Sequence, residues 1–392
     1  MIEKNNFIHS KPKLRFPEFN EDWNRTKIGE ISQTYSGGTP LTSNKQFYEG
    51  DIPFIKSGEI NSEKTEQYIN EEAINNSSAK RVYKGDLLLA LYGATSGEVA
   101  ISKLDGAINQ AVLKIDNDMD NVFQYNYFLK EKDRIVHKYL QGGQGNLSAK
   151  IIRNLEFYYP SLEEQEKISK FLSKIDYKIE LLQSKLNLYQ KLEKEVRNNI
   201  FNFKNGKINF SKFLLGEIAE IKMGFTPSTK NKEFWEDGIY NWLSIADMNK
   251  KYLEETSNKI TEKAIMNKQI VKKGTLVMSF KLTIGKLGIL KEDMFTNEAI
   301  ANFKWKTDEI STEYMYFYLK SINILKYGSQ AAKGITLNKE TLQTIPVYLP
   351  NYNKQKDIVD ILLSFNNKIE LIETQIYELN NFKKGLLQKM FL

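Results

Sequence analysis

The sequence predicts an α+β protein made of two tandem copies of one globular domain, each followed by a long helix. Residues 27–201 and 214–391 repeat the same landmarks in the same order, about 190 residues apart. A period this long indicates whole domains in tandem, because solenoid repeats are only roughly 20–50 residues long. Short apolar runs bounded by Gly, Asn and Ser predict strands in each copy. A heptad pattern then ends each copy and predicts the helices.

The landmarks are short and lie at matched positions in the two copies. They pair, first copy with second, as follows: Lys27–Ile31 with Leu214–Ile218, Gly38–Pro40 with Phe225–Pro227, Asn44–Tyr48 with Asn231–Trp235, Lys84–Gly85 with Lys273–Gly274, Thr95 and Gly97 with Thr283 and Gly285, Asn109–Ala111 with Asn297–Ala299, Gln141 and Gly145 with Gln330 and Gly334, and Lys178–Leu181 with Lys368–Leu371. Other matched positions have diverged: Tyr92 faces Lys281, and Gly142–Gly143 faces Ala331–Ala332. The framework is shared, and the loop side chains differ.

Each copy is expected to mix strands and short helices. Strands are predicted at Asp86–Ala90, Val99–Ile101 and Thr275–Met278, where apolar residues run between turn-forming residues. Tyr125–Tyr139 and Tyr314–Tyr327 are rich in aromatic residues and predict short helices. This mixture defines an α+β domain.

After the turns at Pro160–Ser161 and Pro350–Asn351, apolar residues follow alternating steps of four and three. Such heptads specify a helix that packs on another helix, so the two long helices are expected to pack on each other. The alternative is that each helix packs on its own domain. Periodicity does not distinguish parallel from antiparallel packing; we expect an antiparallel coiled coil, which would relate the two halves by a pseudo-twofold axis. The seam residues are Ile168, Leu172, Ile175, Ile179, Leu182, Leu186, Tyr189, Val196 and Ile200, and then Ile358, Leu362, Phe365, Ile369, Ile372, Ile376, Leu379, Leu386 and Met390.

Polar residues break the two seams at matched positions. Glu193 interrupts the first seam and Lys383 interrupts the second. A polar residue in a seam can specify the register of the helices, and a locally solvated seam is the equal alternative.

Composition narrows the class of protein. The 392 residues carry a net charge of +7 and a pI near 9.0, which is compatible with nucleic-acid binding, although many basic proteins bind none. Cysteine is absent and the two histidines, His9 and His137, lie far apart, so disulfides and structural zinc are excluded. No apolar run approaches the roughly 18 residues of a membrane span, and the polar N-terminus lacks a signal-peptide core. A soluble, cytoplasmic protein is expected.

In this order, and twice over, the landmarks resemble those of one family, the specificity subunit of type I restriction-modification systems. The resemblance covers essentially the whole chain. Its motifs are a Gly-Gly-Thr-Pro loop at Gly37–Pro40 (varied at Gly224–Pro227), Lys84–Leu88 (weaker at Lys273–Val277), Gly93–Gly97 (altered at Leu282–Gly285), and a Pro-x-x-x-x-Gln helix start at Pro160 and Gln165, repeated at Pro350 and Gln355.

The resemblance implies four segments. Residues 1–157 would form the first target-recognition domain with an N-terminal arm, and 158–204 the central helical spacer. Residues 205–347 would form the second target-recognition domain, and 348–392 the C-terminal helical spacer.

The resemblance also implies a subunit that performs no chemistry. Each recognition domain would read one part of a split, asymmetric double-stranded DNA site, while the coiled coil sets the gap and docks two modification subunits. Those modification subunits and separate restriction subunits would supply adenine methylation and ATP-driven cleavage. The sequence agrees, since it holds no methyltransferase motif, phosphate loop or dinucleotide fingerprint. No catalytic residue, metal or cofactor is expected. Two alternatives are a coiled-coil adaptor that does not bind DNA and an enzyme whose site is not recognised.

Candidate DNA-contacting residues are polar, basic or glycine residues of the loops, because loops supply most binding residues and forked polar groups read base edges. The first-domain candidates are Ser36, Gly38, Thr39, Asn44, Lys45, Tyr92, Thr95, Gln141, Gln144 and Asn146. The second-domain candidates are Thr226, Lys230, Asn231, Lys232, Lys281, Thr283, Lys286, Gln330 and Lys333. The alternative for each is an ordinary turn residue or a solvated side chain.

Other polar and aromatic residues are expected to serve the fold. Asn109 and Asn297 are expected to brace a loop by hydrogen bonding rather than to read DNA. The aromatic residues Phe47, Tyr48, Trp235 and Trp242 are expected to belong to cores rather than to stack on bases.

Overall fold

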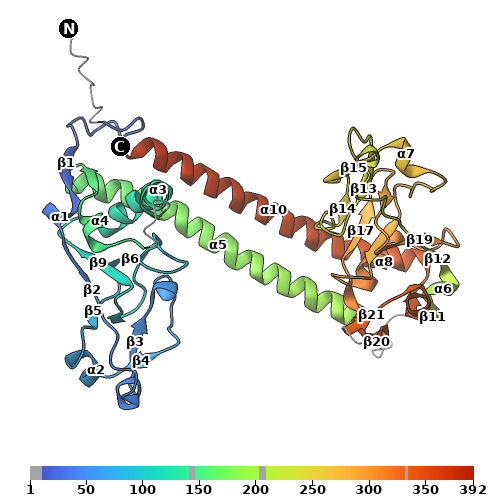
Figure 1. The fold of residues 1–392 in the computed structure, drawn as a ribbon, viewed down its shortest axis with the longest axis horizontal. Helices are drawn as coiled ribbons and strands as arrows, with labels where there is room; N and C mark the ends of the chain where they lie inside the picture. The colour runs from blue at the N-terminus through green and yellow to red at the C-terminus, as the bar shows by residue number, and fades with distance from the viewer. Residues whose placement is uncertain (1–10, 141–145, 203–208, 332–333) are drawn as a thin grey trace, which may run out of the picture. The chain divides into compact units, whose positions relative to one another are not determined.

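The computed structural model describes residues 11–140, 146–202, 209–331 and 334–392. They form two compact units: unit 1 comprises the chain up to Gln183 together with Thr374–Leu392, and unit 2 comprises Ser184–Glu373. Each unit thus contains one globular domain and a portion of both long helices (Figure 1). None of the described helices is long and apolar enough to cross a membrane.

The domain of unit 1 contains two four-stranded sheets, ordered β2-β9-β6-β7 and β4-β3-β8-β5, and the strand pair β1-β10. Its strands are β1 (Asn24–Lys27), β2 (Gln33–Ser36), β3 (Ile52–Ile55), β4 (Tyr68–Ile69), β5 (Lys80–Val82), β6 (Leu87–Ala90), β7 (Val99–Ile101), β8 (Gly106–Ile108), β9 (Val112–Asp116) and β10 (Glu156–Tyr159). Its helices are α1 (Ile28–Ile31), η1 (Lys45–Tyr48), η2 (Ser57–Glu59), α2 (Glu71–Asn75), α3 (Asn121–Leu140) and α4 (Ala149–Arg153), followed by the long helix α5 (Leu162–Ile200).

The domain of unit 2 contains a five-stranded sheet, β12-β19-β16-β17-β14, a three-stranded sheet, β15-β13-β18, and the pairs β11-β22 and β20-β21. Its strands are β11 (Ser211–Leu214), β12 (Ala219–Met223), β13 (Tyr240–Leu243), β14 (Tyr252–Leu253), β15 (Asn258–Ile260), β16 (Leu276–Ser279), β17 (Leu287–Leu290), β18 (Phe295–Thr296), β19 (Ile300–Trp305), β20 (Ser329–Ala331), β21 (Gly334–Thr336) and β22 (Pro346–Leu349). Its helices are α6 (Leu215–Ile218), η4 (Lys232–Phe234), α7 (Glu262–Ile265), α8 (Thr312–Ser321), η5 (Ile324–Tyr327) and α9 (Lys339–Gln343), followed by the long helix α10 (Tyr352–Met390).

The sequence repeat is also a structural repeat. The antiparallel order β2-β9-β6-β7 of the first domain matches β12-β19-β16-β17 of the second, and the second domain adds β14 parallel to β17. The predicted strands and α3 are confirmed. The helix predicted over Tyr314–Tyr327 is wrong in its second half: α8 ends at Ser321, and a separate 3₁₀ turn, η5, follows.

The Pro-x-x-x-x-Gln motif fixes the start of each long helix. The Gln165 amide donates to the Pro160 carbonyl at 2.9 Å, and its oxygen accepts from the Asp120 backbone at 3.2 Å. Gln355 repeats this pattern, donating to the Pro350 carbonyl at 3.0 Å and accepting from the Ser311 backbone at 2.9 Å. Both glutamines are buried, so the motif joins helix and domain through satisfied polar groups.

The two long helices pack antiparallel. In unit 1 the beginning of α5 (Ile168 and Leu172) and the end of α10 (Leu386 and Met390) lie side by side in one apolar core (Figure 1). In unit 2 the reverse holds: the end of α5, at Ile200, packs in the core that contains the beginning of α10. The alternative in which each helix packs only on its own domain is therefore wrong.

The residue that follows each helix is a buried phenylalanine. Phe391 follows α10 and lies in unit 1, with its ring centroid 5.0 Å from that of Phe123 and 6.3 Å from that of Trp23. Phe201 follows α5 and lies in unit 2, with its centroid 5.7 Å from that of Tyr314. The core of each domain is thus completed by the helix that follows the other domain in the sequence.

The polar residues in the seams are buried and paired. Lys383 of α10 donates to both carboxylate oxygens of Asp176 of α5, at 2.6 and 2.7 Å. Glu193 accepts from Arg197 at 2.9 Å, and Arg197 also donates to the Lys320 carbonyl at 3.0 Å. The solvated-seam alternative is therefore wrong, and these groups have the partners that buried charges require.

Replacing Phe391 by Ala should destabilise unit 1 by about 3–5 kcal/mol, because it leaves a cavity among buried rings. The Phe391 side chain is only 3% exposed. The measurement is denaturant unfolding of the full chain, with hydrogen exchange to locate the loss. Phe382, on the same helix but 56% exposed, provides the control, and F382A should change stability by less than about 0.5 kcal/mol. Equal effects of the two substitutions would contradict the role of Phe391 in the core.

Candidate nucleic-acid interface

Four loop segments of the first domain meet at one edge of the sheet β2-β9-β6-β7. The backbone N–H of Gly37 donates to the Asn109 carbonyl at 3.2 Å, and that of Leu91 donates to the Ala111 carbonyl at 2.8 Å. The Leu147 N–H then donates to the Leu91 carbonyl at 3.0 Å. We call residues 36–40, 91–97, 109–111 and 146–147 the first loop edge. It brings together the candidates Ser36, Gly38, Thr39, Tyr92, Thr95 and Asn146.

The side chains of this edge differ in availability. Thr39 and Asn146 are exposed, and the Thr39 hydroxyl donates to the Gln110 amide oxygen at 2.6 Å. Ser36, Tyr92 and Thr95 are half-buried, and Gly38 is buried. The other first-domain candidates lie outside this edge. Asn44 caps η1 by accepting from the Gln46 N–H at 3.2 Å, and Lys45, the first residue of η1, is exposed. Gln141 and Gln144 lie outside the described residues.

The second domain repeats this edge with different side chains. The Phe225 N–H donates to the Thr296 carbonyl at 2.8 Å, and the Phe280 N–H donates to the Ala299 carbonyl at 3.0 Å. We call residues 224–227, 280–286 and 297–299 the second loop edge. It brings together the candidates Thr226, Lys281, Thr283 and Lys286.

Three of these four side chains are exposed, and the fourth is used inside the domain. Thr226, Lys281 and Thr283 are exposed, and the Thr226 hydroxyl bonds to the Glu298 carboxylate. The Lys286 ammonium donates to the Ile245 carbonyl at 3.0 Å.

The remaining second-domain candidates lie outside this edge. Asn231 caps η4 by accepting from the Glu233 N–H at 3.1 Å, whereas Lys230 and Lys232 are exposed. The Gln330 backbone lies in the β20-β21 hairpin, but its side chain and the whole of Lys333 lie outside the described residues.

The expectation that Asn109 and Asn297 brace loops is confirmed. Asn109 accepts from the Ala111 N–H at 3.0 Å, and Asn297 accepts from the Ala299 N–H at 2.7 Å. Both therefore hold their own loop edge in shape.

The aromatic residues also lie where the sequence placed them. Phe47 and Trp242 are buried, and the half-buried Trp235 packs edge-on against Trp242 at 5.0 Å between centroids. Tyr48 is half-buried, and its hydroxyl donates to the Pro40 carbonyl at 2.8 Å. These contacts confirm that the four aromatic residues belong to the fold.

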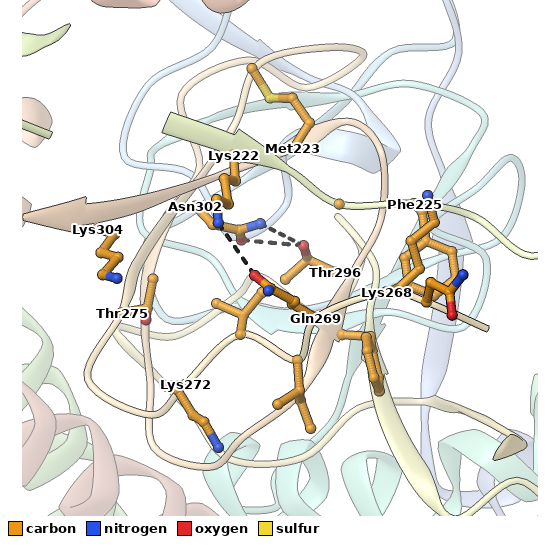
Figure 2. Close-up of a pocket in the computed structure, with 15 residues that line it drawn as sticks. Lys222, Met223, Phe225, Lys268, Gln269, Lys272, Thr275, Thr296, Asn302 and Lys304 are labelled. Atoms are coloured by element: carbon orange, nitrogen blue, oxygen red, sulfur yellow. Dashed lines mark hydrogen bonds between the residues drawn. The ribbon is translucent and has the colours of Figure 1, made fainter. Parts of the chain in front are cut away.

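A cavity of about 650 Å³ adjoins the second loop edge at Met223–Phe225 and Thr296. Asn302 and Thr296 form its polar centre, joined by hydrogen bonds of 3.0 and 3.2 Å (Figure 2). None of the described residues that line it is acidic. Four lysines line it, namely Lys222, Lys268, Lys272 and Lys304.

Two of these lysines have polar partners. Lys222 donates to the Gln269 side chain at 3.3 Å, and Lys272 pairs with Asp293 at 2.8 Å. Lys304 is exposed and has no ion pair in the part of the chain that the structure describes. The sequence did not reveal this cluster, because β12 and β19 were not predicted from it. The sequence signal that could have predicted β12 is Lys222 between the apolar Ile221 and Met223, because such alternation is typical of a half-buried strand.

The first domain carries a different group at the matched position. Lys222 pairs with Asn302 in the register of β12 and β19, and the corresponding pair in β2 and β9 is Tyr35 with Lys114. The Lys114 ammonium is buried and lies 2.8 Å from the Asp86 carboxylate. Burial lowers the pKa of Lys114, but its hydrogen bonds to Asp86 and Tyr35 outweigh that effect and raise it. At this matched position, the first domain thus has a lysine in an internal ion pair, whereas the second domain has residues that line a cavity together with several lysines.

The sequence match decides the family. Residues 20–192 and residues 207–381 each match the model of the type I restriction modification DNA specificity domain. The chain belongs to this family. It is the DNA specificity subunit of a type I restriction-modification system, a non-catalytic subunit, as the sequence landmarks indicated.

Curated relatives agree with this assignment. The chain is 24% identical to the MjaVIII specificity subunit of Methanocaldococcus jannaschii, over 95% of this chain and 92% of that protein. It is 26% identical to the EcoR124I/EcoR124II specificity subunit of Escherichia coli, over 53% of this chain and 52% of that protein.

Two solved structures share the fold of this specificity subunit. The type I restriction-modification S subunit from M. genitalium superposes with a TM-score of 0.63 at 18% identity, covering 97% of this chain and 99% of that chain. A chain from a study of complex assembly and conformational transition of the type I R-M system gives a TM-score of 0.59 at 15% identity, covering 94% and 97%.

One half-buried lysine of the specificity subunit, Lys251, has a buried ammonium nitrogen without a hydrogen-bonding partner among the described residues. The Lys251 ammonium lies 4.7 Å from the ring centroids of Tyr252 and Phe317 and 5.3 Å from that of Tyr316. Burial lowers the pKa of Lys251 from 10.5 to about 8. Ring faces attract a cation but replace its hydration only in part.

Replacing Lys251 by Met should therefore stabilise unit 2 at pH 7. Below pH 8 the folded state bears the cost of a buried ammonium, and between pH 8 and 10.5 the unfolded state binds more protons, so stability rises with pH. The variant should lose this rise. Urea unfolding at pH 7, 8, 9 and 10 measures the difference between the two proteins. K250M, at the exposed neighbouring lysine, should change stability by less than about 0.5 kcal/mol. A destabilised K251M variant would show that the lysine–ring contacts are net favourable.

Proposed function

We propose that this specificity subunit reads a two-part, asymmetric DNA site, one part with each domain, and that α5 and α10 set the gap between the parts. The observation that carries the proposal is one scaffold, present twice, with different chemistry at matched positions of its loop edges. A protein that read two identical half-sites would need the same side chains in both copies.

Three matched positions illustrate this difference. Thr39 bonds to the neutral Gln110, whereas Thr226 bonds to the charged Glu298. Tyr92 of the first edge corresponds to Lys281 of the second. Next to the loop edges, in the sheets themselves, the ion pair of the buried Lys114 in the first domain corresponds to the lysine-lined cavity in the second. The backbone hydrogen bonds that shape the loops are nevertheless equivalent, so the difference lies in recognition chemistry and not in the fold.

The exposed polar and basic side chains are the proposed DNA contacts. Lysines neutralise phosphates and position the duplex, while amides, hydroxyls and other forked groups read base edges. Asn44, Asn231 and Lys286 bond within their own domain, so we propose that they shape the loops rather than read bases. Gln141, Gln144, Gln330 and Lys333 remain candidates by residue type and place in the repeat.

We propose that two modification subunits dock on the long helices, one in each unit, and that restriction subunits join through them. The support is a set of exposed apolar side chains on these helices, which a partner could cover. In unit 1 they are Tyr177, Leu181, Tyr377 and Phe382, and in unit 2 they are Leu188, Leu192, Ile361 and Leu371. In such a complex the partner subunits supply methylation and ATP-driven cleavage.

Lys304 tests the proposed phosphate contacts beside the cavity. In the complex with its modification subunits, K304A should weaken binding to all DNA sequences alike and reduce the slope of log affinity against log salt by about 1, the loss of one phosphate contact. Lys306 is the matched control two residues further along, because its ammonium already donates to the Gly216 carbonyl at 2.7 Å. Equal salt slopes for the native chain and K304A would remove Lys304 from the interface.

Exchange of one domain tests the two-part reading and the spacing role together. Strands β1 and β10 pair over Asn24–Lys27 and Glu156–Tyr159, so replacing residues 24–159 with the matching segment of a relative transfers this strand pair intact. The chimera should methylate a site with one new part, the other part unchanged, and the original gap, because both long helices are retained. Mapping of methylated adenines gives the result. A change in both parts would contradict one domain per part, and a changed gap would contradict the spacing role.

A further inference from the structure

Leu282 lies at the tip of the loop that joins β16 to β17, in a conformation that leucine rarely adopts. Its backbone φ is +60°, and its side chain is 92% exposed. No other large apolar side chain in the described part of the chain is as exposed. An exposed leucine side chain loses the stabilisation that its burial would give. A left-handed backbone conformation also costs energy in any residue that has a Cβ atom.

The fold does not require a leucine here. The loop of the first domain has the same hydrogen-bonded base, since Gly97 donates to the Ala90 carbonyl at 2.8 Å and Gly285 donates to the Ser279 carbonyl at 2.8 Å. At the matched position the first domain has Gly93, with φ +83°. Glycine adopts this backbone conformation without strain, so the fold itself gives no reason for a leucine at this position.

Hydrogen bonds hold the backbone of the loop that carries Leu282. The Ser279 hydroxyl donates to the Thr283 carbonyl and accepts from the Lys286 N–H at 3.0 Å, which closes the loop behind its tip. Phe280, at the start of the loop, is buried in the core of the domain. A residue on a loop that is already hydrogen-bonded loses little backbone freedom when it binds, which favours its use as a contact.

The surroundings of Leu282 fit DNA. Lys281 and Thr283 are exposed on either side of it, and the loop belongs to the second loop edge. A lysine beside an apolar group suits a groove in which phosphates lie next to base edges. In the major groove the apolar feature of the base pairs is the C5 methyl group of thymine.

We propose that Leu282 reads a thymine through its C5 methyl group in the part of the DNA site bound by the second domain. The inference rests on the proposed function. Insertion of Leu282 between base pairs is the less favoured alternative. It would require the DNA to unstack, and the exposed apolar tip is a single side chain between two polar ones.

The test is a double-mutant cycle between protein and DNA. After the site has been mapped, the complex with its modification subunits is titrated with DNA carrying either thymine or uracil in the second part, because uracil lacks only the methyl group. The native chain should bind thymine DNA roughly fourfold more tightly, the worth of one buried methyl group. The L282G complex should bind both DNAs equally, with the affinity that the native chain has for uracil DNA, and its melting temperature should not fall. L282M, which keeps an apolar side chain, should restore most of the preference for thymine.

Met266 supplies the matched control. It has a φ of +49° and is 78% exposed in the same domain, but it follows α7, outside the second loop edge. M266G should keep the native preference for thymine.

Three outcomes would overturn the inference. They are a native complex indifferent to uracil, an L282G complex that keeps the thymine preference, and an equal loss on both DNAs accompanied by increased fluorescence of a neighbouring 2-aminopurine, which would indicate insertion. If the complex binds and methylates a two-part site in any of these cases, the proposed function stands and only the role of Leu282 fails.

Discussion

The fold depends on the antiparallel pairing of α5 with α10, because each helix ends in the core of the other domain. Helix α5 follows the first domain and ends in the core of the second, and α10 follows the second domain and ends in the core of the first. Phe391 packs with Trp23 and Phe123, and Phe201 packs with Tyr314. The antiparallel direction is what allows the start of one helix and the end of the other to meet in each core. Loss of this pairing would open both domains as well as the coiled coil.

The landmarks that identify the family are mostly framework residues. Gln165 and Gln355 join helix to domain, Asn109 and Asn297 brace loops, and Gly37 passes the Ile108 carbonyl so closely that a Cβ would lie 1.7 Å from it. Such residues recur because both copies need the same backbone path. Differences in recognition must therefore come from matched positions that hold different residues in the two copies, such as Tyr92 and Lys281.

The sequence predicted the domain repeat, the long helices and their packing on each other, because heptads and a long repeat are local and periodic signals. The antiparallel direction was expected and is confirmed, but periodicity alone does not decide it. It also placed Ser36, Tyr92 and Asn146 among the candidates, and the structure brings them to one sheet edge. It did not predict that Asn44 and Asn231 cap short helices, since that role depends on the backbone that follows. It missed Lys222 and Lys304 because strand pairing, a long-range property, brings these residues to one cavity. Leu282 was not predicted for another reason: nothing in the sequence indicates that a leucine adopts a left-handed backbone conformation.

The ion pair between the buried Lys383 and the half-buried Asp176 bears on which helices can associate. Along the repeat, Lys383 of α10 corresponds to Glu193 of α5, and Asp176 of α5 corresponds to Asn366 of α10. If a second α5 took the place of α10, Glu193 would lie opposite Asp176, and two carboxylates would face each other in the seam. If a second α10 took the place of α5, Lys383 would face the uncharged Asn366. Like charges or an unpaired charge in a partly buried seam cost more than a fully exposed mismatch. The seam thus discriminates against self-association of either half, and it favours a chain that carries two different domains over a symmetric pair of identical ones.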